Sequence, residues 1–238
     1  MGAPEHRLAW WWDGRRGGPV LGGLVRLALD DGGSAAFECG LLPGGARTVL
    51  LADHTVRAAA GGRMELRSPG LWVELVVEEP GEHLSVGMEA FGVAVDDPDD
   101  AWHGGPDHLF RGNRLPVGLD LEAERASEPI VIGGQEGSTA IPCRVFGEVL
   151  VADEVHDVDG WGWWTNGVVP QGRVMGRLDD GTWWPTGIPA EATGEDPVAK
   201  DVGPVGRTPV LATNGVQVDR RLVQFTTDGR PGVGWAED

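Results

Sequence analysis

Polar and apolar residues alternate with a period of two along several parts of this chain. Within 115–124 the odd positions are apolar up to Leu121, whereas Asp120, Glu122 and Glu124 are acidic. Within 83–91 the even positions are apolar and the odd positions carry His83, Glu89 and Phe91, among others. Successive side chains of a β-strand point to opposite faces, so both segments are predicted to be half-buried strands.

The same signal extends over most of the sequence. Further strands are expected at 6–13, 19–29, 49–55, 71–79, 82–95, 144–152, 216–226 and 232–237, with turns rich in glycine, proline and aspartate between them. The one helix expected is short, at 97–102, and 185–209 is interpreted as a long surface loop. Strands at this spacing predict a sandwich or a barrel. We expect an N-terminal β half, 1–125, and a C-terminal half, 126–238, which could form one continuous domain.

The charge balance argues against several classes of partner. The chain has 37 acidic and 19 basic residues, a formal net charge of −18. Such a surface repels phosphate backbones and anionic lipids, so nucleic acid and membrane partners are not expected. The two cysteines, Cys39 and Cys143, cannot form a disulfide framework, and neither a signal peptide nor an apolar membrane span is visible. We therefore expect a cytoplasmic protein, and whether it forms a homodimer stays open.

Tryptophan is the unusual component, with eleven tryptophans and no tyrosine. They cluster at 10–12, at 161–164 and at 183–184. Adjacent residues of a strand face opposite sides, so both sides of the sheet must accept an indole, as in a barrel with an apolar lumen and a packed exterior. The tryptophans are either ordinary core or the wall of a ligand cavity. Under the second interpretation, the substrate-binding candidates are Trp11, Trp72, Phe91, Trp161, Trp163, Trp164, Asn166 and Trp183.

No familiar catalytic, nucleotide or metal motif is present. The sequence lacks a Gly-x-Ser-x-Gly elbow, a Walker motif, and a Gly-x-Gly-x-x-Gly between a strand and a helix. His103, Asp107 and His108 could bind zinc, but a solvated loop is the preferred interpretation because no further ligands cluster there. We expect neither a metal nor an organic cofactor.

Three residues are candidates for acid–base chemistry: Glu89, His83 and His156. Glu89 lies in mid-strand beside apolar residues, where burial would raise its pKa towards a useful value. The alternative is that Glu89 points outwards and pairs with an arginine. His83 shares its face but lies ~20 Å away along the strand. Asp53–His54 and His156–Asp157 are adjacent pairs whose members face apart in a strand, and Glu148 is a mid-strand carboxylate like Glu89.

Several segments are similar to AttH-like and carotenoid hydratase-like lipocalin proteins of bacteria. The resemblance is carried by 71–74, 79–98, 114–122, 147–151 and 228–237, which spread over most of the chain. It implies a calycin-type fold, often two packed lipocalin-like barrels or half-barrels. The wider group includes isoprenoid hydratases, tocopherol cyclase and decalin-forming pericyclases, which hold a hydrophobic polyene or polyketide without an organic cofactor.

This chain departs from the resemblance at one segment. Relatives tend to carry a stretch similar to Asp-Gly-x-Gly-x-Arg-Asp-His-Ser-Trp-Gly, whereas 159–167 is shorter and lacks the Arg-Asp-His. If that histidine does chemistry in relatives, this protein works differently or performs none. His156 and Asp157 lie just upstream and could partly substitute.

Together these observations predict an all-β, lipocalin-like antiparallel barrel. The expected function is a cofactor-independent enzyme, a cyclase, pericyclase or hydratase-type lyase or isomerase. It would act on a hydrophobic isoprenoid or polyketide in an aromatic-lined cavity, in natural-product biosynthesis. The alternative is a non-catalytic carrier of a hydrophobic small molecule, and a purely structural protein is the third interpretation.

Overall fold

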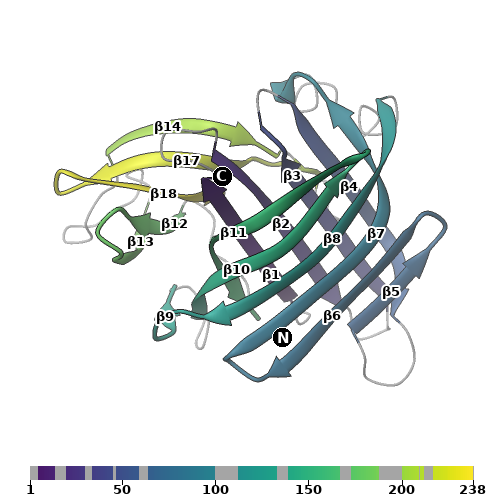
Figure 1. Cartoon of the computed structure of the whole chain (residues 1–238), viewed down its shortest axis with the longest axis horizontal. Coiled ribbons are helices and arrows are strands. Elements are labelled where there is room, and N and C mark those ends of the chain that lie inside the picture. The colour runs from purple at the N-terminus through teal and green to yellow at the C-terminus, as the bar shows by residue number, and fades with distance from the viewer. Residues whose placement is uncertain are drawn as a thin grey trace.

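The computed structural model describes residues 5–13, 20–29, 34–44, 47–58, 64–99, 112–132, 139–166, 173–187, 200–208, 210–211 and 217–237. The eighteen strands in these residues form two main sheets and one two-stranded ladder, so the predicted all-β class is confirmed (Figure 1). In the expected helix, only the start is described, where the amide of Asp99 donates to the Asp97 carboxylate at 3.0 Å. The rest of that segment, 100–102, lies outside the described residues.

The larger sheet contains eleven strands from the first two-thirds of the chain. They are β1 (Glu5–Asp13), β2 (Val20–Leu29), β3 (Ser34–Leu42), β4 (Thr48–Ala58), β5 (Met64–Ser68), β6 (Leu71–Glu79), β7 (His83–Val95), β8 (Asn113–Arg125), β9 (Ile130–Val131), β10 (Thr139–Val151) and β11 (Glu154–Thr165). All of their pairings are antiparallel. β11 pairs with β10 on one side and with β1 on the other. The sheet therefore curls into a near-closed ring, a barrel whose strands follow one another around the wall.

The pairing between β4 and β7 covers only a short part of both strands. β4 pairs with β7 only through Thr48–Leu50, opposite Val93–Val95. Its far end, at Arg57 and Ala58, pairs with β5 instead. The β5–β6 hairpin is thus inserted between β4 and β7 at one end of the barrel only. The ring is narrower at one end than at the other, and the wall forks where the hairpin begins.

The second sheet comes from the C-terminal part of the chain, in the order β13-β12-β18-β17-β14. Its strands are β12 (Arg173–Leu178), β13 (Trp183–Gly187), β14 (Lys200–Arg207), β17 (Arg220–Thr227) and β18 (Arg230–Glu237), while β15 (Val210–Leu211) and β16 (Gln217–Val218) form the separate ladder. The surface loop expected at 185–209 is therefore wrong at both of its ends, where β13 and β14 lie. The change of sheet falls between β11 and β12, and the division into halves at residue 125 stays a prediction.

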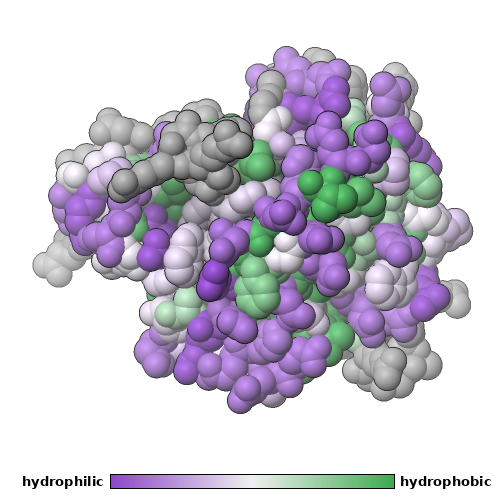
Figure 2. All heavy atoms as spheres, viewed as in Figure 1, coloured by the Kyte–Doolittle hydropathy of each residue, from purple (hydrophilic) through white to green (hydrophobic). Residues whose placement is uncertain are grey.

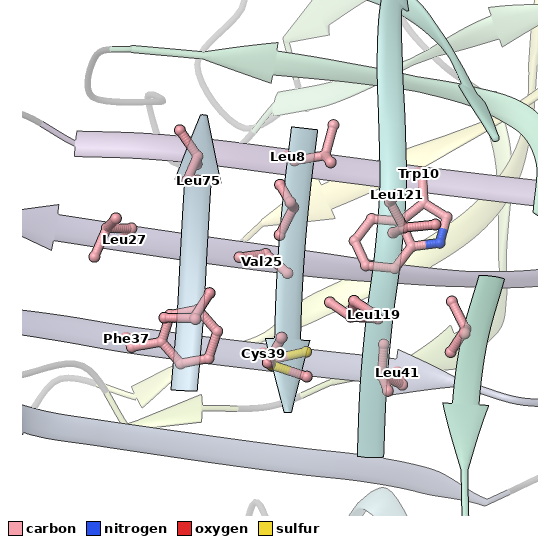
Figure 3. Packing of buried hydrophobic residues seen from close by; sticks show 14 of the residues in the cluster. Leu8, Trp10, Val25, Leu27, Phe37, Cys39, Leu41, Leu75, Leu119 and Leu121 are labelled. Carbon is pink, nitrogen blue, oxygen red and sulfur yellow. The ribbon is translucent and has the colours of Figure 1, made fainter. Parts of the chain in front are cut away.

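The two faces of the barrel wall carry different cores. The inner face contributes one cluster, the lumen cluster, which includes Leu8, Trp10, Phe37 and Leu121 from strands on opposite sides of the lumen (Figure 3). The outer face of the same wall contributes Trp11 and others to a second cluster, shared with the C-terminal sheet. Neighbouring tryptophans do point to opposite faces, as expected, because Trp10 and Trp12 lie inside the barrel and Trp11 lies outside.

Candidate functional site

The fork in the barrel wall opens a hollow of about 480 Å³. It is bounded by β4 at 50–55, by the turn between β5 and β6 at 68–71, and by Phe91 and Val93 on β7. The ladders leave 51–56 of β4 without a partner strand on this side among the described residues. The volume falls in the usual range of small-molecule pockets, and the position in the wall gives direct access from solvent.

The hollow joins the surface to the apolar interior. Leu71 and Leu51, which line it, belong to or pack against the lumen cluster. Leu50 and Val93, also in the lining, form a separate buried cluster with Val95. A ligand in the hollow would therefore contact aliphatic side chains connected to the core of the barrel, and bury apolar surface there.

Asp53 is the carboxylate of this hollow, and it is held by three hydrogen bonds. The Ser68 hydroxyl donates to it at 2.7 Å, and Thr55 donates both its amide, at 3.0 Å, and its hydroxyl, at 3.1 Å. Partial burial works to raise the pKa of Asp53, but these hydrogen bonds outweigh it and keep the pKa below the ordinary value. Asp53 is therefore ionised at neutral pH and fixed in position.

Phe91 separates the hollow from a second one on the outer wall. Its side chain is 56% exposed, and its amide donates to the carbonyl of Gly70 at 3.1 Å. Gly70 has a φ of +89°, a conformation that favours glycine at this turn. The adjoining hollow, about 580 Å³, is lined by Trp72, Glu89 and Phe91 together with residues of β8 and β10. Three predicted site residues are thus brought together here.

Glu89 takes the outward orientation, one of the two that the sequence left open. It lies exposed on the outer face of β7, opposite Trp72 on β6. The alternating pattern correctly predicted which residues share its face, and it left open whether this face is turned to the lumen or to solvent. Of the two orientations, the buried one is therefore wrong, and the catalytic role of Glu89 stays a prediction.

The other predicted histidines lie apart from both hollows. His83, at the start of β7, contacts the Glu122 carboxylate on β8. His156 on β11 lies 3.9 Å from Glu154. Neither residue lines either hollow, so a role for them in chemistry there stays a prediction.

Most of the predicted aromatic residues gather outside the barrel. Trp11 and Trp161 each meet Trp183 edge to face, with ring centroids 6.1 Å apart, and Trp163 belongs to the same cluster beneath the C-terminal sheet. The Arg177 guanidinium lies 4.0 Å from the ring centroid of Trp161. In contrast, Trp164 packs in the lumen, and Asn166 is exposed after the end of β11. The tryptophans of the second cluster therefore connect the barrel to the C-terminal sheet.

A buried ionic network, absent from the sequence-based candidates, lies between the barrel and the C-terminal sheet. Glu38 on β3, fully buried, is 2.9 Å from Arg26 on β2 and 2.6 Å from Arg220 on β17. Glu237 on β18 is 2.6 Å from Arg7 on β1 and 3.2 Å from Arg220. The network thus links three barrel strands to two strands of the other sheet.

The charges around Glu38 keep it ionised despite its burial. Burial works to raise its pKa, but the His54 imidazole, 3.4 Å away, and the guanidiniums of Arg220 and Arg26 lower the pKa to about 2. Arg7 and Arg220 likewise hold the pKa of Glu237 below its ordinary value, against the effect of burial. The available signal was Glu38 itself, a single charge within the otherwise uncharged run 34–42.

The described residues show no metal centre. In this part of the chain, no group of three or more His, Cys, Asp and Glu side chains is placed to hold an ion. His103, Asp107 and His108 lie outside the described residues. No described helix is long and apolar enough to cross a membrane.

Both cysteines are buried. Burial raises the pKa of Cys39 to about 12, although Arg220 works to lower it, and raises the pKa of Cys143 well above its ordinary value.

Comparison with known proteins places the fold. No protein-family model matches the chain, and no curated protein matches its sequence. A solved structure from Nitrosomonas europaea, of a protein that bears the provisional name AttH, superposes with a TM-score of 0.52, over 99% of this chain and 92% of that one. The chain has an AttH-like fold. Only 12% of the residues are identical, so the AttH-like architecture is what the two proteins share.

Proposed function

We propose that this protein binds a hydrophobic small molecule in the hollow at the fork between β4 and β7. The hollow supports this by its size, by its aliphatic lining and by its connection to the lumen cluster. In the described residues, the buried charged side chains are Arg7, Glu38, Asp219, Arg220 and Glu237, and none of them lines the hollow or joins the lumen cluster. An interior of this kind favours a carrier of an isoprenoid or polyketide over a site built for proton transfer.

Binding of farnesol, an isoprenoid alcohol, tests this proposal. Phe91→Ala should weaken binding about fivefold, because the side chain forms one wall of the hollow. Val155→Ala is the matched control, since Val155 is 58% exposed on β11 and lines neither hollow. Isothermal titration calorimetry would report both affinities. The proposal fails if the unaltered protein does not take up farnesol, or if the two variants bind it equally well.

A second candidate, a cofactor-independent cyclase, isomerase or lyase, is favoured by Asp53. An ionised carboxylate fixed at the edge of an apolar hollow can orient and stabilise a cationic reacting group. Turnover would be sought by incubating the protein with a hydrophobic cell extract and analysing the products by mass spectrometry. Loss of turnover in Asp53→Asn, with binding retained, would support catalysis by Asp53. Loss of turnover in Glu89→Gln instead would place the chemistry in the adjoining hollow. If neither the extract nor purified polyenes are turned over, the carrier function is the one that remains.

A further inference from the structure

The charge on the hollow's rim defines the ligand more closely. Arg114, near the start of β8, lies opposite Val93 on β7 and lines the hollow. Its side chain is exposed, so it can turn towards an incoming group at little cost. The lining therefore combines a guanidinium with aliphatic side chains.

Arg114 differs from the other arginines whose side chains the structure describes. Ten of these pair with a carboxylate: Arg7, Arg26, Arg47, Arg67, Arg125, Arg144, Arg207, Arg220, Arg221 and Arg230. Arg177 stacks on Trp161. For Arg114 there is neither an ion pair nor a stacking ring among the described residues. In a chain with 37 acidic and 19 basic residues, an arginine without a carboxylate partner is unusual.

The carboxylate within the hollow does not pair with Arg114. Asp53 keeps its negative charge, but its oxygens accept hydrogen bonds from Ser68 and Thr55, and no ion pair joins it to Arg114 among the described residues. The remaining surroundings of Arg114 in the lining are mainly aliphatic and aromatic, including Leu71, Phe91 and Val93. A guanidinium has five donors in a planar fork that matches a carboxylate. The partner that fits both features is a negative group attached to a hydrocarbon chain.

We propose that the ligand is an amphipathic carboxylate, such as an isoprenoid or fatty acid, whose head group binds Arg114 while its chain occupies the hollow. This inference rests on the proposed binding function and goes further by naming the charged end of the ligand. The net charge of −18 opposes the approach of any anion, but salt at physiological strength screens charges beyond about 8 Å. The ligand carboxylate and the Arg114 guanidinium would lie closer together than this distance, so salt does not abolish their attraction.

Farnesol and farnesoic acid, which share the same chain, separate the head group from the hydrocarbon. At pH 7.5 and 0.15 M salt, calorimetry should show the acid binding about tenfold more tightly than the alcohol, as expected for one charge-assisted interaction. In Arg114→Gln, the acid should lose this advantage. Arg144→Gln is the matched control, because Arg144 is an exposed arginine on β10 that pairs with Asp159 and lines neither hollow.

The outcomes distinguish this inference from the function on which it rests. Equal affinities of the unaltered protein for acid and alcohol would overturn the amphipathic carboxylate and leave hydrophobic binding intact. A preference for the acid that persists in Arg114→Gln, or that disappears in Arg144→Gln, would also overturn it. If neither probe binds, the proposed function and this inference fail together.

Discussion

Strands β1, β2 and β3 present two very different surfaces on opposite faces of one wall. Towards the lumen they place Leu8, Val25 and Phe37, all within a continuous apolar cluster (Figure 3). Towards the C-terminal sheet they place Arg7 and Glu38, which are as deeply buried but charged and lie on the same face as apolar residues of the second cluster. The exposed remainder of the barrel is mainly hydrophilic on the face shown in Figure 2.

The two buried faces are stabilised by different physics. Apolar packing in the lumen is non-directional. The free energy that it contributes depends on the apolar area that is buried and on how well the side-chain volumes fill the space. The network beneath the C-terminal sheet has opposite requirements, because each buried charge must find its partner at a fixed position. Glu38 joins β3 to β17 through its ion pair with Arg220, whereas contacts in the lumen do not fix individual atoms in this way. Mutations on the two faces test this difference.

Removing Glu38 should produce the largest effect. Glu38→Ala removes the carboxylate that Arg26 and Arg220 share and leaves Arg220 with Glu237 alone, and should lower the free energy of unfolding by about 3 kcal/mol. Urea denaturation followed by circular dichroism would measure it. Asp159→Asn is the control, since it breaks the exposed pair with Arg144 and should cost about 0–1 kcal/mol. Similar costs for the two variants would show that the buried network adds no more than a surface pair.

Acid should weaken the same network without any mutation. The pKa of Glu38 is about 2 in the folded protein and near 4.5 in its ordinary state, so the unfolded chain binds the proton more readily. The stabilisation is complete above about pH 4.5 and is lost as the pH falls towards 2, up to about 3 kcal/mol. Glu237, whose pKa is also lowered, acts in the same direction. Unfolding free energies measured across this range should fall with acid, and Glu38→Ala should flatten the profile. A profile of equal slope in that variant would assign the acid sensitivity to other groups.

The alternating pattern predicted β7 and β8, whose two faces differ, and it failed at β3, whose two faces do not. β7 and β8 alternate clearly because one face of each lies in the lumen and the other is largely exposed. β3 was missed because it is buried on both faces, so its residues do not alternate and Glu38 passed unnoticed. Other strands were missed as well, namely β5, β9, β11, β12, β13, β14 and β15.

The hollow could not have been predicted from local patterns. It exists because β4 pairs with β7 for three residues and then with β5, and the β4–β7 pairing joins segments that are more than forty residues apart. Phe91 and Trp72 were predicted as ligand contacts because they are aromatic. Phe91 lines both hollows, and Trp72 lines the second one. Asp53 was considered only as a neighbour of His54. Its hydrogen bond to Ser68 across the fork is a tertiary contact that no spacing in the sequence reveals.

A smaller effect is expected from adding volume to the inner face. Gly23 on β2 lies beneath Trp10, and a Cβ atom there would come within 2.4 Å of the indole ring. Trp10 is fully buried, so Gly23→Ala should displace it and cost about 1–3 kcal/mol. Gly87→Ala is the matched change on the outer wall, where the added Cβ would lie 3.2 Å from the rim of the half-buried Trp72, and should cost about 0.5 kcal/mol or less. Urea denaturation of both variants would test this. If Gly23→Ala proves as mild as Gly87→Ala, the indole of Trp10 must have space to move into. The lumen would then contain unfilled volume that a ligand entering through the fork could occupy.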